Sequence, residues 1–327
     1  MHSISWLEQT ATRYIREKAR ASLDGEPGSL AKFWAAGPAG RRGLKQVAEE
    51  REALRRAEET GRFRYIKVEA TVQLGPPETA PRGVLLPIRE RLDRWYEKEG
   101  QQASYALVRT HRTLWVPRGD DWALAEDEAG QEGRRLAPLR PVLGSEPGPY
   151  EEQSQGSAGG PAYRRGAAVD YAERWWDGYN PEYRAFDVDC TSFISQCLAA
   201  GDAPQWDTGR QDMGWWYRRQ GGPQDQWSLS WAVAHSLRWY LAGSRQALQA
   251  EQVKDPRLLQ PGDVIHYDFD GDGVWEHTTM VVDLDPGGEP LVNAHTAPSR
   301  RRPWRYADSP AWTSRTRYLF WRVRDRF

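Results

Sequence analysis

The first 60 residues carry apolar positions at helical spacing on an otherwise charged background. Leu7, Ala11, Tyr14 and Ile15 recur on one face of a helix, and residues 40–61 are highly charged with a sparse apolar stripe. A stripe of this kind is typical of a helix that buries one face and exposes the other. The pattern therefore predicts helices over residues 1–60.

From residue 63 the period changes from helical spacing to simple alternation. Residues 63–75 and 104–119 alternate apolar and polar side chains, and residues 120–128 suit a last strand. Helices followed by long antiparallel strands predict an α+β domain with a curved sheet over residues 1–140, similar in pattern to cystatin-like or nuclear-transport-factor-like folds. His111, in one of these strands, is expected to be a packed or surface histidine.

Residues 141–162 consist largely of Gly, Pro, Ser, Glu and Gln, as in SEPGPYEEQSQGSAGGP. A segment with so few apolar side chains cannot form a core. We therefore expect a flexible linker here, followed by a second domain over residues 163–327.

The second domain shows helical patterns first and strand patterns last. Helices are expected over residues 163–178, through the segment that starts at Asp189, and from Ser230 onward. Strands are expected at residues 262–269, 277–285, 289–296 and 316–325. This order predicts a second α+β domain with an antiparallel sheet.

Charge and composition narrow the possible partners. The chain has 45 basic and 46 acidic residues, a formal net charge of −1, so its overall charge gives no reason to expect a nucleic acid partner. It contains no apolar run of the ~20 residues that a membrane span needs, and its first residues do not resemble a signal peptide. We expect a cytoplasmic protein without membrane partners, with export by another route as the alternative; its oligomeric state is not predicted. The 17 tryptophans are expected to anchor the core, with a sugar-stacking groove as the alternative.

The two cysteines occur in the segment DCTSFISQCLAAG. In one helix, Cys190 and Cys197 would lie roughly 10 Å apart along the axis, too far for a disulfide. Asp189 suits the N-cap, which places Cys190 in the first turn, where the helix dipole favours a thiolate. A thiolate there can act as a nucleophile, and nearby amides can bind an oxyanion. The alternative is a buried thiol that only fills space.

Two histidines stand out as partners for this cysteine. A hairpin centred near residues 286–287 would place His277 opposite Thr296 and beside His295, with Asn293 one pair further in. Pairing of this kind brings an imidazole and a second polar group together at one end of a sheet, as in a nucleophile, base and orienting residue. Each histidine alone could equally be a surface strand residue.

The loop DFDGDGVWE resembles the first half of a calcium-binding loop. Its acidic positions alternate: Asp268, Asp270 and Asp272. Gly273 stands at the sixth place, but Thr279 replaces the bidentate glutamate of the twelfth, and Glu276 stands at the ninth. The alternatives are a polar turn and a structural calcium site that would fix the loop before His277. No cofactor is expected to be required for catalysis.

Three segments of the second domain resemble a bacterial family described as a "putative amidase domain". They are AVDYAERWWDGYNPEYRAFDVDCTSFISQCLAAGD, PGDVIHYDFDGDGVWEHTTMVV and LVNAHT. The resemblance covers about residues 163–327 and implies a fold related to the papain-like cell-wall hydrolases of the NlpC and CHAP kinds.

By position, the resemblance implies Cys190 as nucleophile, His277 as base and His295 as the residue that orients it, with Asn293 as substitute. The glutamine that completes the oxyanion hole in papain-like proteases is replaced by Arg184, so Tyr183 or Tyr179 is the candidate for that role.

The implied activity is hydrolysis of an amide, in a peptide or a peptidoglycan stem, through an acyl-thioester. Acyl transfer to an amine and a non-catalytic module that binds a glycan or peptide are the alternatives.

Overall fold

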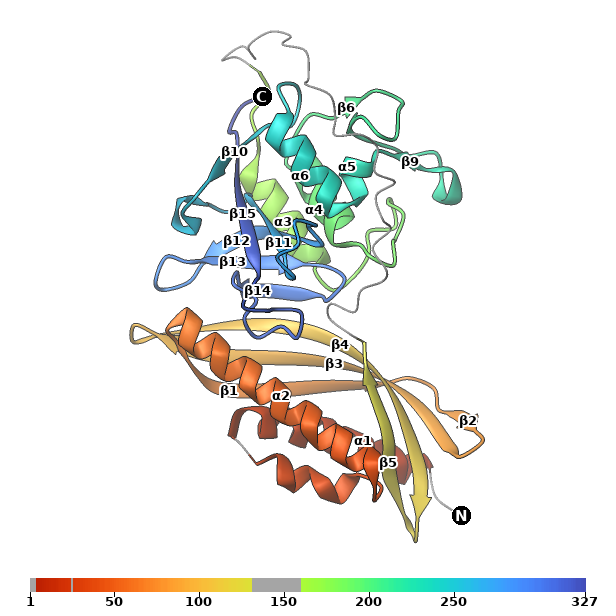
Figure 1. The fold of residues 1–327 in the computed structure, drawn as a ribbon. Coiled ribbons are helices and arrows are strands. Elements are labelled where there is room, and N and C mark those ends of the chain that lie inside the picture. The colour runs from red at the N-terminus through yellow and green to blue at the C-terminus, as the bar shows by residue number, and fades with distance from the viewer. Residues whose placement is uncertain (1–3, 25, 131–159) are drawn as a thin grey trace. The chain divides into compact units, whose positions relative to one another are not determined.

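A computed structural model describes residues 4–24, 26–130 and 160–327, which divide into two compact units (Figure 1). Unit 1 comprises residues 1–133 together with 305–310, and unit 2 comprises residues 134–304 together with 311–327. The linker expected at residues 141–162 lies outside the described residues, except for residues 160–162. None of the helices in the described ranges is both long and apolar enough to cross a membrane.

Unit 1 is an α+β unit in which helices precede an antiparallel sheet. Its elements are α1 (Ile4–Asp24), the 3-10 helix η1 (Pro27–Phe33), α2 (Pro38–Gly61), β1 (Arg64–Leu74), β2 (Glu78–Ala80), β3 (Gly83–Lys98), β4 (Gln101–Arg118) and β5 (Asp121–Ala129). The strands pair in the order β1, β3, β4, β5, and β2 pairs with β3. Both long helices lie on the same side of this sheet (Figure 1).

The strand β3 was not expected from the sequence, although it is central in this sheet. Its side chains alternate between buried and partly exposed positions along nearly the whole strand. The buried positions include Glu90 and Arg94 as well as Leu92. Charged residues on the inward face conceal the apolar alternation that usually reveals a strand.

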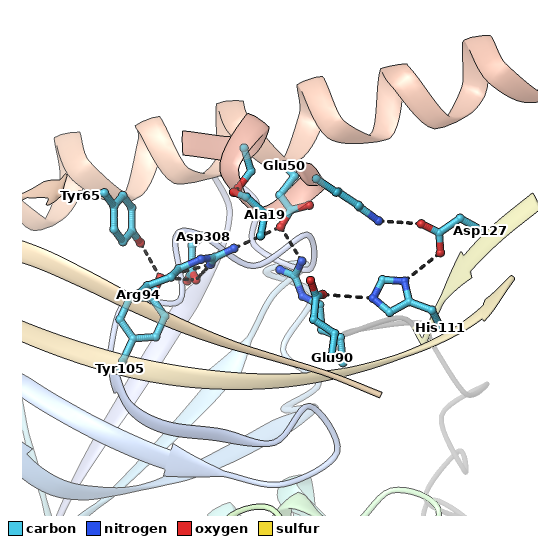
Figure 2. Close-up of polar contacts among 12 residues, drawn as sticks. Ala19, Glu50, Tyr65, Glu90, Arg94, Tyr105, His111, Asp127 and Asp308 are labelled. Atoms are coloured by element: carbon cyan, nitrogen blue, oxygen red, sulfur yellow. Dashed lines mark hydrogen bonds and ion pairs between the residues drawn. The ribbon is translucent and has the colours of Figure 1, made fainter. Parts of the chain in front are cut away.

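The inward charges of unit 1 are paired with one another (Figure 2). His111 Nδ1 lies 2.8 Å from Asp127 Oδ1 and its Nε2 lies 3.1 Å from Glu90 Oε2. Lys18 and Tyr14 on α1 donate to the other oxygen of Asp127, each at 2.8 Å. His111 is therefore a packed histidine, as expected, but one held between two carboxylates.

A second buried network surrounds the Arg94 guanidinium (Figure 2). Arg94 donates to Glu50 Oε1 at 3.1 Å and to Asp308 Oδ2 at 3.2 Å. The Tyr105 hydroxyl donates to the same oxygen of Asp308 at 3.0 Å. These partners neutralise a charge that would be very unfavourable alone in the interior.

Unit 2 is also α+β. Its helices are α3 (Arg165–Trp175), α4 (Cys190–Ala200), η2 (Gly222–Gln224), α5 (Leu229–Ala232), α6 (Ala234–Gly243) and η3 (Pro256–Leu258). Its short strands β6 (Trp206–Asp207), β7 (Gly214–Trp215), β8 (Tyr217–Arg218) and β9 (Gln226–Trp227) pair as β6 with β7 and β8 with β9. Its main sheet contains β10 (Ala250–Val253), β11 (Val264–Asp268), β12 (His277–Leu284), β13 (Pro290–Ala294), β14 (Ser299–Pro303) and β15 (Arg317–Val323).

The main sheet of unit 2 is antiparallel, in the order β14, β13, β12, β11, β15, β10. Side chains from α4, including Phe193, Ile194 and Cys197, share one buried apolar cluster with Met280 of β12 and Trp321 of β15. The helix α4 is thereby held against one face of the sheet, which fixes its first residue near the start of β12.

The helix expected from Ser230 is two helices. Val233 adopts an extended conformation (φ −121°, ψ 122°) and separates α5 from α6. The β-branched Val233 is well suited to extended backbone, so the interruption has a local cause that the apolar spacing did not reveal.

Candidate active site

Cys190 is the first residue of α4, as the sequence predicted. Asp189 occupies the N-cap position and Gly201 the C-cap position of this helix. Cys190 is 2% exposed, whereas Cys197, two turns further on, is fully buried in the apolar cluster. Both are free thiols. Of the two, only Cys190 lies at a helix terminus, where polar backbone groups are available to it.

The sulfur of Cys190 lies beside the start of β12. Its thiol donates to the carbonyl oxygen of Glu276 at 3.8 Å and lies 3.7 Å from the hydroxyl of Thr191. Thr191 in turn lies 3.2 Å from the hydroxyl of Thr278. Glu276 and Thr278 are the chain neighbours of His277. The tertiary structure thus brings the nucleophile candidate to the backbone on either side of the base candidate.

The surroundings of Cys190 favour a thiol rather than the expected thiolate. Burial raises the pKa of Cys190, and the carboxylate of Asp189 acts in the same direction. Hydrogen bonds from the hydroxyl of Thr191 and the backbone of Thr278 act against them without compensating. This direction is opposite to the one expected from the helix position, because the charged form loses more hydration on burial than the nearby hydrogen bonds return.

The hairpin of β12 and β13 has the predicted register near the site. Met280 pairs with Asn293 and Val281 with Val292, as a register with His277 opposite Thr296 requires. A register shift between Val281 and Asp283 lies on the turn side of these pairs. The sequence therefore placed the two strands correctly at the end that carries the polar residues.

The ring of His277 packs among aromatic side chains. His277 pairs across the sheet with Tyr267, whose ring centroid lies 5.5 Å away, and that of Phe269 lies 6.1 Å away. Successive side chains of a strand point to opposite faces, so the ring lies on the opposite face from Thr278. Burial, with Arg302 nearby, lowers the pKa of His277 to about 3. The imidazole is thus neutral, and its contact with the Cys190 sulfur stays a prediction.

His295 holds Asp189 rather than the imidazole of His277. Its Nδ1 lies 2.8 Å from Asp189 Oδ2, and its Nε2 lies 2.6 Å from the carbonyl oxygen of Trp175. The ring also stacks on Phe193, with centroids 3.8 Å apart. Both nitrogens are occupied, so the orienting role that the resemblance implies is not the one seen in this structure.

The Asp189–His295 pair lies buried beside the sulfur-bearing residue. Both ring nitrogens face oxygen atoms, and the carbonyl of Trp175 can only accept a hydrogen bond. Burial raises the pKa of Asp189 against the opposing effect of His295. The pair thus joins the residue before Cys190 to the segment that follows β13.

Asn293 lies away from the sulfur and joins two other elements. Its amide nitrogen donates to the carbonyl oxygen of Ala172 and to Glu173 Oε1, both at 3.2 Å. Its amide oxygen accepts from the backbone N–H of Arg301 at 2.7 Å. Asn293 is fully buried. It therefore secures α3 to the sheet and is occupied in that role.

The two tyrosine candidates are in different places. Tyr179 is 55% exposed, and its ring meets that of His295 edge-on at 5.4 Å. Tyr183 packs against the rings of Tyr217 and Trp231 at 5.1 and 6.1 Å. The structure therefore brings Tyr179 to the Asp189–His295 pair, and places Tyr183 in an aromatic cluster.

Thr296 is a site residue to which the sequence gave no role. Its hydroxyl oxygen accepts from the backbone N–H of Asp189 at 3.0 Å and of Cys190 at 3.2 Å. The side chain of Asp189 makes no capping hydrogen bond, contrary to expectation, because it pairs with His295. The predicted register had already placed Thr296 opposite His277, which was the available signal.

The acidic loop gathers a different set of carboxylates from the one predicted. Oxygens of Asp268, Asp272 and Glu276 lie within 4.8 Å of one another, so Glu276 takes the place expected for Asp270. Burial and the carboxylates of Asp270 and Asp268 raise the pKa of Glu276 to about 7, against a hydrogen bond from a backbone amide. Asp268 accepts three backbone amides of its own loop. This arrangement suits both a polar turn and a calcium ligand set.

Part of the chain matches a known family. Residues 162–321 match the family described as "Putative amidase domain". The match includes Cys190, His277 and His295. The family points to a hydrolase of amide bonds.

Two curated proteins of Bacillus subtilis (strain 168) are similar to this chain. "Uncharacterized protein YhbB" is 50% identical over 163 residues, which are 50% of this chain and 51% of that protein. "Uncharacterized protein YjcM" is 29% identical over 126 residues, or 35% of this chain and 26% of that protein. The chain thus spans about half or less of the length of these relatives. No solved structure matches.

Proposed function

We propose that residues 163–327 form a cysteine-dependent amidase with a papain-like arrangement of nucleophile and base. Cys190 is the nucleophile and His277 the base. The observation that carries this proposal is the position of the Cys190 sulfur, 3.8 Å from the carbonyl oxygen of Glu276, at the strand start that bears His277. The match of residues 162–321 to the family described as "Putative amidase domain" supports it.

The proposed reaction has two steps. The sulfur of Cys190 attacks the amide carbon while His277 takes the thiol proton, so an S–C bond forms. The C–N bond then breaks, and His277 returns the proton to the leaving amine. Water hydrolyses the thioester in the second step, giving a carboxylic acid and the free thiol. Transfer to an amine instead of water is the acyl-transfer variant.

The resting protein starts this reaction from two neutral groups. The pKa of Cys190 is raised and that of His277 is lowered, both chiefly by burial. A thiolate–imidazolium pair is therefore not preformed, and proton transfer accompanies the attack. The proposal also requires the His277 ring to turn from the Tyr267 side towards the sulfur.

The substrate class is an amide in a peptide or a peptidoglycan stem. The loop before α4 presents Tyr179 and Val188 to solvent, 55% and 40% exposed. These two exposed side chains support a substrate that offers an extended apolar surface or an extended backbone. The competing function is a module that binds a peptide or glycan without cleaving it. The raised pKa of Cys190 favours that alternative, because a module that only binds its ligand does not need a reactive thiolate.

Turnover assays distinguish the two functions. Peptidoglycan fragments and peptide amides are incubated with the wild type, Cys190→Ala and the matched control Cys197→Ala, and products are identified by mass spectrometry. We expect cleavage by the wild type and the Cys197→Ala variant only. Equal cleavage by Cys190→Ala, or binding without cleavage by all three proteins, contradicts the proposal.

A further inference from the structure

The hydroxyl of Thr296 supplies the cap that α4 does not provide for itself. The first amides of a helix have no acceptor within the helix, and the Asp189 side chain makes no capping bond. Thr296, 107 residues after Asp189 in the chain, accepts the amides of Asp189 and Cys190 at 3.0 and 3.2 Å. One oxygen atom from a distant segment therefore lies where two unpaired donors converge.

The backbone fixes this oxygen from the side of β13. Thr296 has φ 73°, in the left-handed region that β-branched residues rarely adopt. Its neighbour His295 is bonded to the carboxylate of Asp189 at 2.8 Å. Consecutive residues of one segment thus hold the residue before Cys190, one by its ring and one by its hydroxyl. The backbone of this segment therefore brings the Thr296 side chain to the two amides.

The amide of Cys190 is also the donor that the proposed reaction needs. When a sulfur attacks a carbonyl, the oxygen gains negative charge and must be met by hydrogen-bond donors already in place. The backbone N–H of the nucleophile residue is adjacent to the attacked carbon. In the resting protein Thr296 occupies it.

We propose that the Thr296 hydroxyl stands in the position of the substrate carbonyl oxygen and moves away when substrate binds. This inference rests on the proposed function of Cys190. The side chain of Thr296 is exposed, so its hydroxyl can rotate into water. The amides of Asp189 and Cys190 then exchange a hydroxyl acceptor for a carbonyl oxygen, and no covalent bond to Thr296 forms. Thr296 therefore competes with the substrate carbonyl for both donors and takes no part in the covalent steps.

Removing the hydroxyl should favour reactions that form an oxyanion and no others. The net free energy of one hydrogen bond corresponds to a rate factor of about 2 to 10. We therefore expect Thr296→Ala to raise acylation of Cys190 by p-nitrophenyl acetate by about this factor, relative to its alkylation by iodoacetamide. Acylation passes through an oxyanion and alkylation does not, so their ratio corrects for any change in access to the sulfur. Thr296→Ser retains the hydroxyl and should restore the wild-type ratio.

Amide hydrogen exchange supplies the second readout. The amides of Asp189 and Cys190 should exchange faster in Thr296→Ala than in the wild type or Thr296→Ser. Faster exchange with a raised acylation ratio supports the proposal. Cys190-dependent acylation that is unchanged or slower in Thr296→Ala overturns the role of Thr296. Acylation absent from all variants, with iodoacetamide still reacting at Cys190, instead contradicts the proposed amidase, and unchanged exchange contradicts the capping itself.

Discussion

The carboxylate of Asp189 and the ring of His295 lie 2.8 Å apart, and each directly precedes a residue of the candidate site. Asp189 precedes Cys190 at the start of α4, and His295 precedes Thr296 after β13. One buried pair therefore sets the distance between the sulfur-bearing helix and the segment that caps it. The pair can support catalysis by position, without touching a substrate.

Replacing His295 by Phe should destabilise unit 2. The phenyl ring retains the stacking on Phe193 but leaves the Asp189 carboxylate buried and unpaired. Removing one partner of a buried pair costs about 3–5 kcal/mol, and we expect a loss of about 3 kcal/mol in the free energy of unfolding. Urea denaturation measures it. Adding Asp189→Asn should restore part of the loss; strictly additive effects would show that the pair contributes nothing.

The thiol of Cys190 should react slowly with iodoacetamide at neutral pH. Burial raises the pKa of Cys190 above its ordinary value of 9.0, and only the thiolate is nucleophilic. In the Cys197→Ala background, we expect the alkylation rate to rise about tenfold per pH unit from pH 7 to 9 without a plateau. Mass spectrometry follows the labelling. A plateau below pH 8 would instead indicate a thiolate stabilised by a cation, and would restore the expectation from helix position.

Glu276 should make unit 2 less stable as the pH rises. Its pKa is raised from an ordinary 4.5 to about 7, so the folded protein binds a proton that the unfolded chain releases. The free energy of unfolding should fall between pH 4.5 and 7 by about 2 kcal/mol. Thermal unfolding at a series of pH values tests this, with Glu276→Gln as the variant that should lose the slope.

Calcium provides a separate test of the same loop. A cation bound by Asp268, Asp272 and Glu276 would keep Glu276 ionised, because the ion compensates the mutual repulsion of the carboxylates. Millimolar calcium should then raise the melting temperature most at pH 7 and above, and not in Glu276→Gln. Equal melting temperatures with calcium and with a chelator would contradict the calcium site, and the loop would then be a polar turn.

His111 should also make unit 1 less stable as the pH rises, but for a different reason: the folded protein favours the charged form of His111 and the neutral form of Glu276. Burial disfavours the imidazolium, but Asp127 and Glu90 outweigh it and raise the pKa of His111 above 6.5. Stabilisation by the charged ring is complete below pH 6.5 and is lost as the pH rises through the raised pKa. We expect hydrogen exchange in β4 and β5 to accelerate over that range. His111→Gln should exchange faster at pH 6 and lose this dependence; a wild type whose exchange follows only the intrinsic chemical rate contradicts it.

Local patterns predicted the helices of both units because each has an apolar stripe that its own residues encode. The strand β3 was missed because Glu90 and Arg94 point inward, and their compatibility with a core depends on partners distant in the chain. The register of β12 with β13 was predictable because alternation and a turn sequence together leave few pairings.

The sequence by itself determined where Cys190 stands on its helix, and that His277 begins a strand paired with the one that leads to His295. Only the tertiary structure decided that Asp189 pairs with His295, that Thr296 caps the helix, and that burial raises the pKa of Cys190. The physical reason is the distance along the chain between the residues that interact. Helix and strand positions follow from neighbours within a few residues, whereas burial and hydrogen-bond partners depend on segments about a hundred residues apart.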